Sequence, residues 1–260
     1  MTDAVIFIFL VLAILVLVAW LLIKPKAKTR TVQPLPENYK QLLNDNVQFY
    51  RKLNDTDKIE FENRVRQFLS SIKINGAGGV QVEELDRLLV GASAIIPIFS
   101  FTNWHYGNIR EVLLYPESFS EEFEITGGNR QVLGMVGDGP MQQVMILSQH
   151  ALREGFSNKT DKNNTAIHEF VHFIDKTDGA TDGIPELLLQ HQYMLPWINL
   201  MHKSIKEIQA NKSDINPYGA TNQAEFFAVV SEYFFERPNL LKTKHPELFG
   251  MLQKVFEKRT

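Results

Sequence analysis

Residues 168–172 read H-E-F-V-H, a spacing that can build a hydrolytic metal centre. On a helix, His168 and His172 lie one turn apart on the same face, so both imidazoles can bind one Zn²⁺ ion. Glu169 then lies beside the metal's open coordination position. Bound Zn²⁺ lowers the pKa of its water toward about 7, and a carboxylate can take that water's proton and later deliver it to a leaving amine. The motif predicts a zinc hydrolase with Glu169 as general base.

The residues around this motif are apolar, which predicts a buried helix. An unpaired carboxylate is costly to bury, so Glu169 and the two histidines need a binding partner inside such a helix. An alternative is open on this evidence: two hydrogen-bonded core histidines and a surface glutamate. The apolar neighbours are Ala166, Ile167, Phe170, Val171, Phe173 and Ile174.

A catalytic zinc usually has three protein ligands, and the chain has no cysteine to supply one. Asp178 follows His168 by ten residues, where metzincins place their last ligand, but Asp175 occupies the position of the glycine on which that arrangement depends. Glu225 lies in a second apolar segment, AEFFAVVSEYFF, with Glu232 seven residues later on the same helical face. We therefore prefer Glu225 as third ligand and keep Asp178 as the alternative.

The elements that position these residues follow from the apolar spacing. The predicted fold class is α+β, a helical majority with a small mixed sheet. Short β-prone runs lie only in the middle third of the chain, at 112–115, 132–136 and 144–147. Helical spacing covers 37–74 as two helices, with a break and a new cap at 54–56, and then 82–96, 162–174, 186–210, 221–235 and 246–256.

The N-terminal segment differs in composition from the rest. Every residue from Ala4 to Ile23 is apolar, which is long enough for a helix to span a bilayer. Residues 24–36 combine basic residues with three prolines and predict a juxtamembrane linker before a domain at 37–260. Because the basic residues follow the apolar run, the positive-inside rule predicts a single-pass protein with its catalytic domain in the cytoplasm.

The overall charge excludes one class of partner. A formal net charge of -3 gives no basic field that would attract nucleic acid. We expect a peptide or protein substrate, and the lipid bilayer as a partner through residues 4–23.

Four segments together resemble the MtfA (Mlc titration factor A) family of bacterial zinc-dependent peptidases, whose gluzincin-like core is also similar to the catalytic domain of lethal-factor type toxins. The resemblance implies a zincin-like metallopeptidase domain. The segments are VLLYPESF at 112–119, GPMQQVMILS at 139–148, IHEFVHFIDKTDG at 167–179, and NPYGATNQAEFFAVVSEYFFERP at 216–238.

The resemblance implies roles for individual residues. It makes His168, His172 and Glu225 the zinc ligands, and Glu169 the catalytic glutamate. Tyr218 matches a tyrosine that can donate a hydrogen bond to the oxyanion, charge that develops only in the transition state. The chain departs from the family at Gln149, where a tryptophan is expected, and in its apolar N-terminal run.

Two further carboxylates could orient the ligands. Asp175 follows His172 by one turn, and Glu232 lies across the predicted helix pair, so either could accept the free N–H of an imidazole. Each could equally serve as a cap or in a salt bridge.

The sequence thus predicts a membrane-anchored zinc peptidase at the bacterial inner membrane. The resemblance implies aminopeptidase-like activity and a regulatory role, which leaves room for a regulatory protein partner. A substrate can bind as an added strand at a sheet edge. The alternative is a zinc-binding regulatory or interaction protein at the membrane with little or no turnover.

Overall fold

The computed structural model describes residues 35–101, 103–119, 132–137, 142–158 and 161–257. These belong to one unit of the chain, which begins at residue 32. Among them, no helix has the length and apolar character needed to cross a bilayer. The predicted anchor at residues 4–23, and all but the last two residues of the predicted linker, lie outside the described residues.

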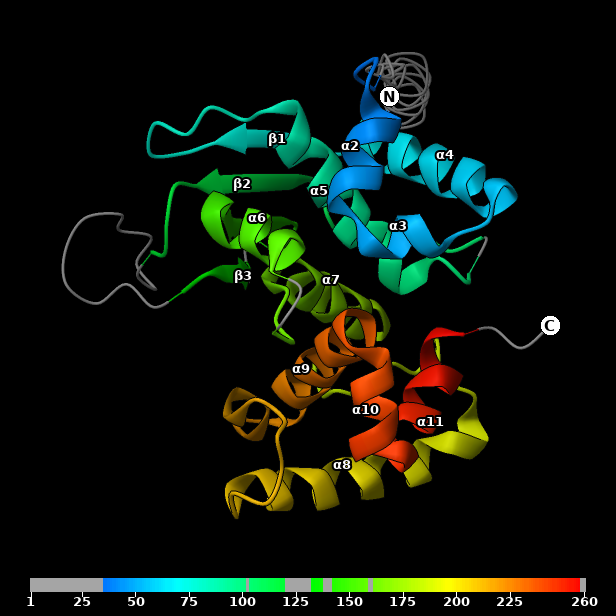
Figure 1. The fold of residues 1–260 in the computed structure, drawn as a ribbon. Helices are drawn as coiled ribbons and strands as arrows, with labels where there is room; N and C mark the ends of the chain where they lie inside the picture. The colour runs from blue at the N-terminus through cyan, green and yellow to red at the C-terminus, as the bar shows by residue number, and fades with distance from the viewer. Residues whose placement is uncertain (1–34, 102, 120–131, 138–141, 159–160, 258–260) are drawn as a thin grey trace, which may run out of the picture. The chain divides into compact units, whose positions relative to one another are not determined.

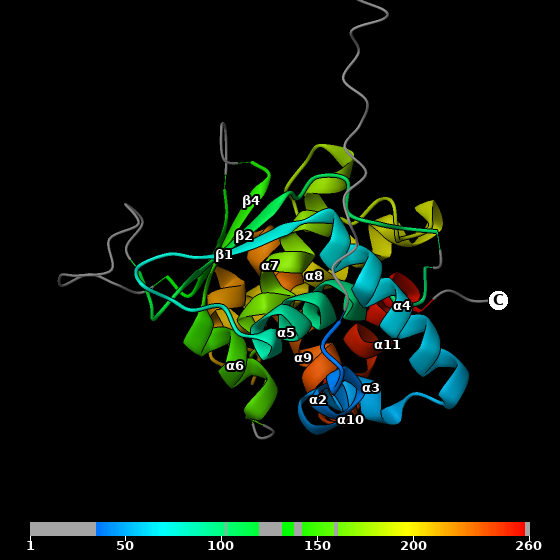
Figure 2. The same cartoon turned by 90° about the horizontal axis from the view of Figure 1, so that it is seen from above.

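A mixed sheet of four strands has the order β1-β2-β4-β3. Figure 1 labels β1, β2 and β3, and Figure 2 labels β4. Strands β1 (Lys73–Gly76), β2 (Glu111–Tyr115) and β4 (Val144–Ser148) are parallel to one another. Strand β3 (Gly134–Val136) pairs antiparallel with β4 and forms one edge. The small mixed sheet beside a helical majority confirms the predicted fold class.

Three helices form the layer next to the sheet. Helices α6 (Gln149–Ser157) and α7 (Thr165–Asp175) contact strands of the sheet, and α5 (Glu84–Ile95) packs against both helices (Figures 1 and 2). Helix α7 carries the H-E-F-V-H motif, and its apolar residues are buried, as the sequence predicts. This layer holds the motif between the sheet and the C-terminal helices.

The C-terminal helices gather around α9 (Gln223–Glu236), which packs against α7. Helices α8 (Met194–Gln209), α10 (Pro238–Lys244) and α11 (Pro246–Phe256) all contact α9. Ten of the fourteen residues of α9 are buried, so most positions on this helix contact other parts of the protein. The contact between α7 and α9 brings the two chemically interesting segments together.

Three N-terminal helices, α2 (Tyr39–Asn46), α3 (Gln48–Lys52) and α4 (Asp55–Ser71), complete the unit. Both α2 and α4 pack against α5. The predicted new cap is confirmed, because the Asn54 side chain accepts a hydrogen bond from the backbone N–H of Asp57. The first of the two predicted helices is divided at Val47.

The structure corrects several predicted boundaries. The helix expected to reach residue 74 ends at Ser71, because residues 73–76 pair with β2. The helix expected from residue 186 begins at Met194. Helices α6 and α10 were not predicted: each is shorter than three turns, and their short apolar patterns do not distinguish them from loops.

Candidate metal centre

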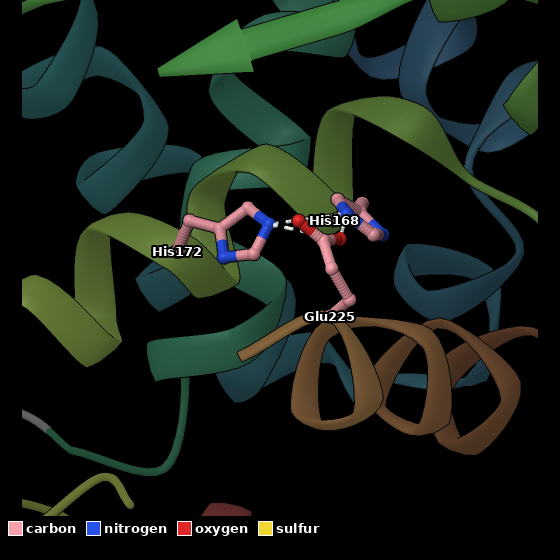
Figure 3. Close-up of side chains that lie close together, drawn as sticks. All are labelled: His168, His172 and Glu225. Atoms are coloured by element: carbon pink, nitrogen blue, oxygen red, sulfur yellow. Dashed lines mark hydrogen bonds and ion pairs between the residues drawn. The ribbon is translucent and has the colours of Figure 1, made fainter. Parts of the chain in front are cut away.

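The three predicted ligands converge where α7 meets α9 (Figure 3). His168 Nε2 lies 2.9 Å from Glu225 Oε2 and 3.1 Å from His172 Nε2. The third side of the triangle, from His172 Nε2 to Glu225 Oε2, measures 3.4 Å. Helix α7 thus supplies two of the ligand atoms and α9 supplies the third. The third residue, Glu225, lies 53 positions after His172 in the sequence.

Two asparagine caps fix where the helices begin. Asn164 accepts a hydrogen bond from Ile167 N–H at the start of α7, and Asn222 accepts one from Glu225 N–H at the start of α9. An N-cap satisfies a donor that the first helical turn leaves free. Because each cap lies three or four residues before a ligand, it sets the direction in which that ligand leaves the helix. Neither asparagine was predicted as a cap from the sequence, although each stands directly before an apolar helix.

The triangle has the dimensions of a zinc site. In a tetrahedral site with bonds of about 2.0–2.1 Å, neighbouring ligand atoms lie about 3.3 Å apart. The three sides observed here are 2.9, 3.1 and 3.4 Å. The three side chains could therefore hold a metal ion after small adjustments.

The donor chemistry points in the same direction. His168 Nδ1 lies 2.7 Å from Glu232 Oε1 and donates its hydrogen to that carboxylate. A neutral His168 imidazole then has a lone pair on Nε2, and this lone pair faces the Glu225 carboxylate and the Nε2 atom of His172. Lone pairs that converge repel one another unless a cation lies between them.

The carboxylates polarise the centre. Burial lowers the pKa of His168, but the charges and hydrogen bonds of Glu232 and Glu225 outweigh it and hold that pKa well above its usual value. Burial raises the pKa of Glu225, yet its hydrogen bonds with His168 and His172 lower it to about 2. The centre thus favours positive charge at His168, which a bound metal ion would supply instead of a proton.

Glu169 lies beside this cluster and against the sheet edge. Its side chain is buried, and burial raises its pKa. A Cβ atom at Gly134 of β3 would come within 2.6 Å of Glu169 Oε1, so only glycine lets the strand approach so closely. Gly134 is a second residue that sequence reasoning missed. A buried glutamate with a raised pKa beside a metal suits a general base.

An open cleft passes the centre on both sides of Glu169. One part, of about 610 Å³, is lined by Met135, Val136, Lys176 and Gln223, and the other, of about 510 Å³, by Leu133, Asn163, Asn216 and Val229. Val132, Gly134, His168, Glu169 and Tyr218 line both parts. The cleft therefore follows β3 past the predicted ligands.

Tyr218 lies at this cleft on the short 3-10 helix η5 (Pro217–Ala220). Asn216 accepts a hydrogen bond from Tyr218 N–H, and the Tyr218 ring centroid lies 6.0 Å from that of His168. The side chain is 54% exposed, and burial of its remaining surface together with Glu225 and Glu169 raises its pKa. A phenol with a raised pKa keeps its proton and can donate it in a hydrogen bond.

The other predicted carboxylates lie in different places. Glu232 contacts His168, as described above, whereas Asp175 Oδ2 accepts a hydrogen bond from Gly183 N–H. In the described part of the chain, Asp175 Oδ1 has no hydrogen-bond partner. Asp178, the alternative ligand, accepts from Ala180 N–H and does not join the metal cluster.

Gln149 occupies the position where the resembling family has tryptophan. Its side-chain amide donates to Asp86 Oδ2 and to Gln81 O. It therefore ties α6 to α5, and it is not among the residues that line the cleft.

A cluster that could hold a metal ion, open to a cleft, is the arrangement that a metallopeptidase needs. Sequence comparison identifies the lineage within that class. The chain belongs to the family described as glucose-regulated metallo-peptidase M90, which matches residues 23–257.

Individual relatives are similar to this chain over most of its length. Uncharacterized protein slr2042 of Synechocystis is 28% identical over 237 residues, covering 86% of this chain and 85% of the relative. Mlc titration factor A of Salmonella arizonae is 29% identical, covering 70% of this chain and 76% of the relative. The protein of the same name from Cronobacter sakazakii is 27% identical, covering 76% of this chain and 77% of the relative. The resemblance to the Mlc titration factor A family is confirmed.

Proposed function

We propose that the protein is a zinc-dependent peptidase that hydrolyses peptide bonds with a water molecule activated at the centre formed by His168, His172 and Glu225. The observation that carries the proposal is the triangle of ligand atoms, 2.9–3.4 Å on a side, next to a buried glutamate. A hydrolase needs such a base, whereas a purely structural zinc site is closed by a fourth ligand.

Bound Zn²⁺ would supply a Lewis acid that makes water a nucleophile near neutral pH. Glu169 accepts the proton of the attacking water, because its carboxylate is held beside the cluster and its raised pKa favours proton uptake. The same carboxyl group then delivers the proton to the amine that leaves. His168 is held in one tautomer by Glu232, so its Nε2 atom remains free to bind metal.

Tyr218 would donate a hydrogen bond to the oxygen that becomes negatively charged in the transition state. Its ring lies next to that of His168, at the junction of the two parts of the cleft. A donor aimed at developing charge accelerates the reaction without tightening substrate binding.

The edge strand supports binding of the substrate as an added strand. Leu133 O accepts from Ser148 N–H and Gly137 N–H donates to Val144 O, so alternate residues of β3 face β4. The backbone groups of Gly134 and Val136 consequently face away from the sheet and are positioned to pair with a peptide. Val132 exchanges two hydrogen bonds with Phe119, which ends this edge on one side.

An aminopeptidase-like preference belongs to the same proposal, on the strength of the resemblance. Peptides with free and with acetylated N-termini test it directly. Release of single N-terminal residues from the free peptide alone would support the preference. Internal cleavage of the acetylated peptide would show that both parts of the cleft receive substrate.

We propose further that residues 4–23 anchor the protein in the bacterial inner membrane with the catalytic domain in the cytoplasm, and that the role is regulatory. The apolar run and the basic residues after it support the topology. The description of the family as glucose-regulated and the name Mlc titration factor A among relatives support the role. Protease accessibility of the domain in sealed vesicles of both orientations tests the topology. Digestion from the outer face would contradict it.

The variant Glu169→Gln tests the catalytic proposal. Zinc content should match that of the wild type, while hydrolysis of a peptide substrate falls by about 10²–10⁴-fold, the contribution of a general base. Unchanged hydrolysis would remove Glu169 from the mechanism. Zinc binding without measurable hydrolysis in the wild type would favour the alternative function, a zinc-binding regulatory protein.

A further inference from the structure

Helix α9 presents three glutamates to α7 along a single face. Glu225, Glu232 and Glu236 are spaced by seven and four residues, which places them in one stripe of the helix. Each reaches a different part of α7 and the turn before it. Glu225 contacts the two histidines, Glu232 accepts from His168 Nδ1, and Glu236 contacts Asn164, the N-cap. Two of these contacts belong to the centre described above, and the third has no role there.

Asn164 connects the third glutamate to the second. The Asn164 side chain is buried, its Nδ2 atom donates to Glu236 Oε1 at 2.9 Å and to Gly155 O at 3.2 Å, and its Oδ1 atom accepts from Ile167 N–H. The backbone N–H of Asn164 donates to Glu232 Oε2 at 2.6 Å. A continuous series of hydrogen bonds thus runs from Glu236 through Asn164 and Glu232 to His168.

Two backbone partners determine the orientation of the Asn164 amide. Gly155 O accepts from Nδ2 and Ile167 N–H donates to Oδ1, so the NH₂ group faces Glu236. This choice fixes the side chain of Asn164, and with it the N-terminal turn whose N–H orients Glu232. Capping alone would not require Glu236, because Gly155 O already accepts from the same amide.

We propose that Glu236 is a positioning residue for the metal centre: through Asn164 and Glu232, it holds the His168 imidazole in the orientation that binds metal. The inference rests on the proposed zinc site. It assigns to Glu236 a role that the mechanism above does not include, because Glu236 touches neither the ligand atoms nor the cleft.

The first test compares Glu236→Ala with Glu236→Gln by zinc affinity, measured in competition with a chromophoric chelator. Residues that orient a metal ligand typically contribute 10- to 100-fold to metal affinity. Glu236 lies two hydrogen bonds beyond such a residue, so we expect the lower end of this range. Glu236→Ala should weaken zinc binding about 10-fold and reduce kcat with KM nearly unchanged. Glu236→Gln keeps an acceptor oxygen and should restore zinc affinity to within about twofold of the wild type.

A second pair of variants reverses the hydrogen bond. Asn164→Asp keeps an N-cap oxygen and the backbone N–H to Glu232, but it sets two carboxylates against each other. Its zinc affinity should fall at least as far as that of Glu236→Ala. In the double variant Asn164→Asp with Glu236→Gln, the new amide can donate to the new carboxylate, and part of the affinity should return.

Glu62 offers a matched control. It is buried on α4 and accepts hydrogen bonds from the hydroxyl groups of Tyr39 and Tyr50, with no part in the metal cluster. Glu62→Ala should lower the melting temperature without changing zinc affinity, which separates positioning from general loss of stability.

Several results would overturn the inference. One is wild-type zinc affinity in both Glu236→Ala and Asn164→Asp. Another is a loss of zinc affinity in Glu62→Ala as large as in Glu236→Ala. A third is a Glu236→Gln variant that binds zinc as weakly as Glu236→Ala. Failure of the wild type to bind zinc would overturn the proposed function, and this inference with it. Zinc binding by the wild type and unchanged binding by the variants would overturn the inference alone.

Discussion

Two carboxylate centres lie against α9, and they differ in what balances their charge. Asp214 accepts hydrogen bonds from Lys162, Lys244, His245 and Tyr233. At the metal centre, the described partners of Glu225 and Glu232 are imidazole nitrogens and one backbone N–H. The first centre contains its own cations, whereas the second gathers carboxylates around two histidines without a lysine or arginine partner for either glutamate in the described structure.

The difference separates a structural centre from one that needs a ligand. Hydrogen bonds from two lysines and two other side chains outweigh the effect of burial and hold the pKa of Asp214 well below its usual value. In the metal centre, the charge of Glu225 and Glu232 is balanced by a proton on His168 or by a metal ion in its place, because buried carboxylates without compensation are costly. Removing a carboxylate from the metal centre should therefore lower zinc affinity. Removing Asp214 should lower only the free energy of unfolding.

The largest effect is expected from Glu225→Gln. A ligand should contribute to zinc affinity at least as much as the partners that orient ligands, which contribute up to about 100-fold. We expect zinc binding to weaken by about 100-fold or more and peptide hydrolysis to fall to background, measured by chelator competition and product analysis. Full zinc retention would return attention to Asp178, and Asp178→Asn is the control.

Zinc itself should stabilise the folded protein. At a free zinc concentration about 1,000 times the dissociation constant, binding to the folded state alone raises the free energy of unfolding by about 4 kcal/mol. Chemical denaturation of the metal-free and zinc-loaded protein measures this difference. It should be the same size in an Asp214→Asn variant. Loss of the zinc effect in that variant would show that the two centres are coupled.

Tyr218→Phe should affect catalysis alone. Removing one hydrogen-bond donor to an oxyanion typically lowers kcat by about 10²-fold or more, and the predicted ligands are His168, His172 and Glu225. Steady-state kinetics should show lower kcat with similar KM, and metal analysis should show full zinc. A variant with wild-type kcat would exclude Tyr218 as the oxyanion donor.

The smallest effect is expected at Asp214. Replacing it with asparagine should lower the free energy of unfolding by about 1–3 kcal/mol at pH 7, because charged hydrogen bonds are weakened in a partly exposed position. The folded-state pKa of Asp214 is depressed, so its contribution is present above the unfolded-state pKa of about 3.9 and is lost as the pH falls toward the folded-state value. The difference between wild type and variant in denaturant titrations should therefore shrink below about pH 4. A difference that grows with acid would contradict this account.

Much of the site could be predicted from local patterns. His168, Glu169 and His172 follow from the i, i+4 spacing on one helix, and Glu225 follows from a charged residue in an apolar segment. The link from Glu232 to His168 could be proposed but not chosen over Asp175, because it depends on how α7 crosses α9, 64 residues apart in sequence.

The missed parts depend on contacts that sequence spacing does not contain. Strand β1 has four residues and pairs with a strand 38 residues later, so it carries little local signal. Gly134 is needed because of Glu169 on a different element. Asn164 looks like an ordinary cap until Glu232 and Glu236 are seen to share it.

The most direct measurement is anomalous diffraction at the zinc absorption edge from crystals grown with zinc. The account predicts one strong peak about 2.0–2.1 Å from His168 Nε2, His172 Nε2 and a Glu225 oxygen, with open space toward Glu169. A zinc ion bound elsewhere, or no peak at these three residues in zinc-saturated crystals, would contradict the account.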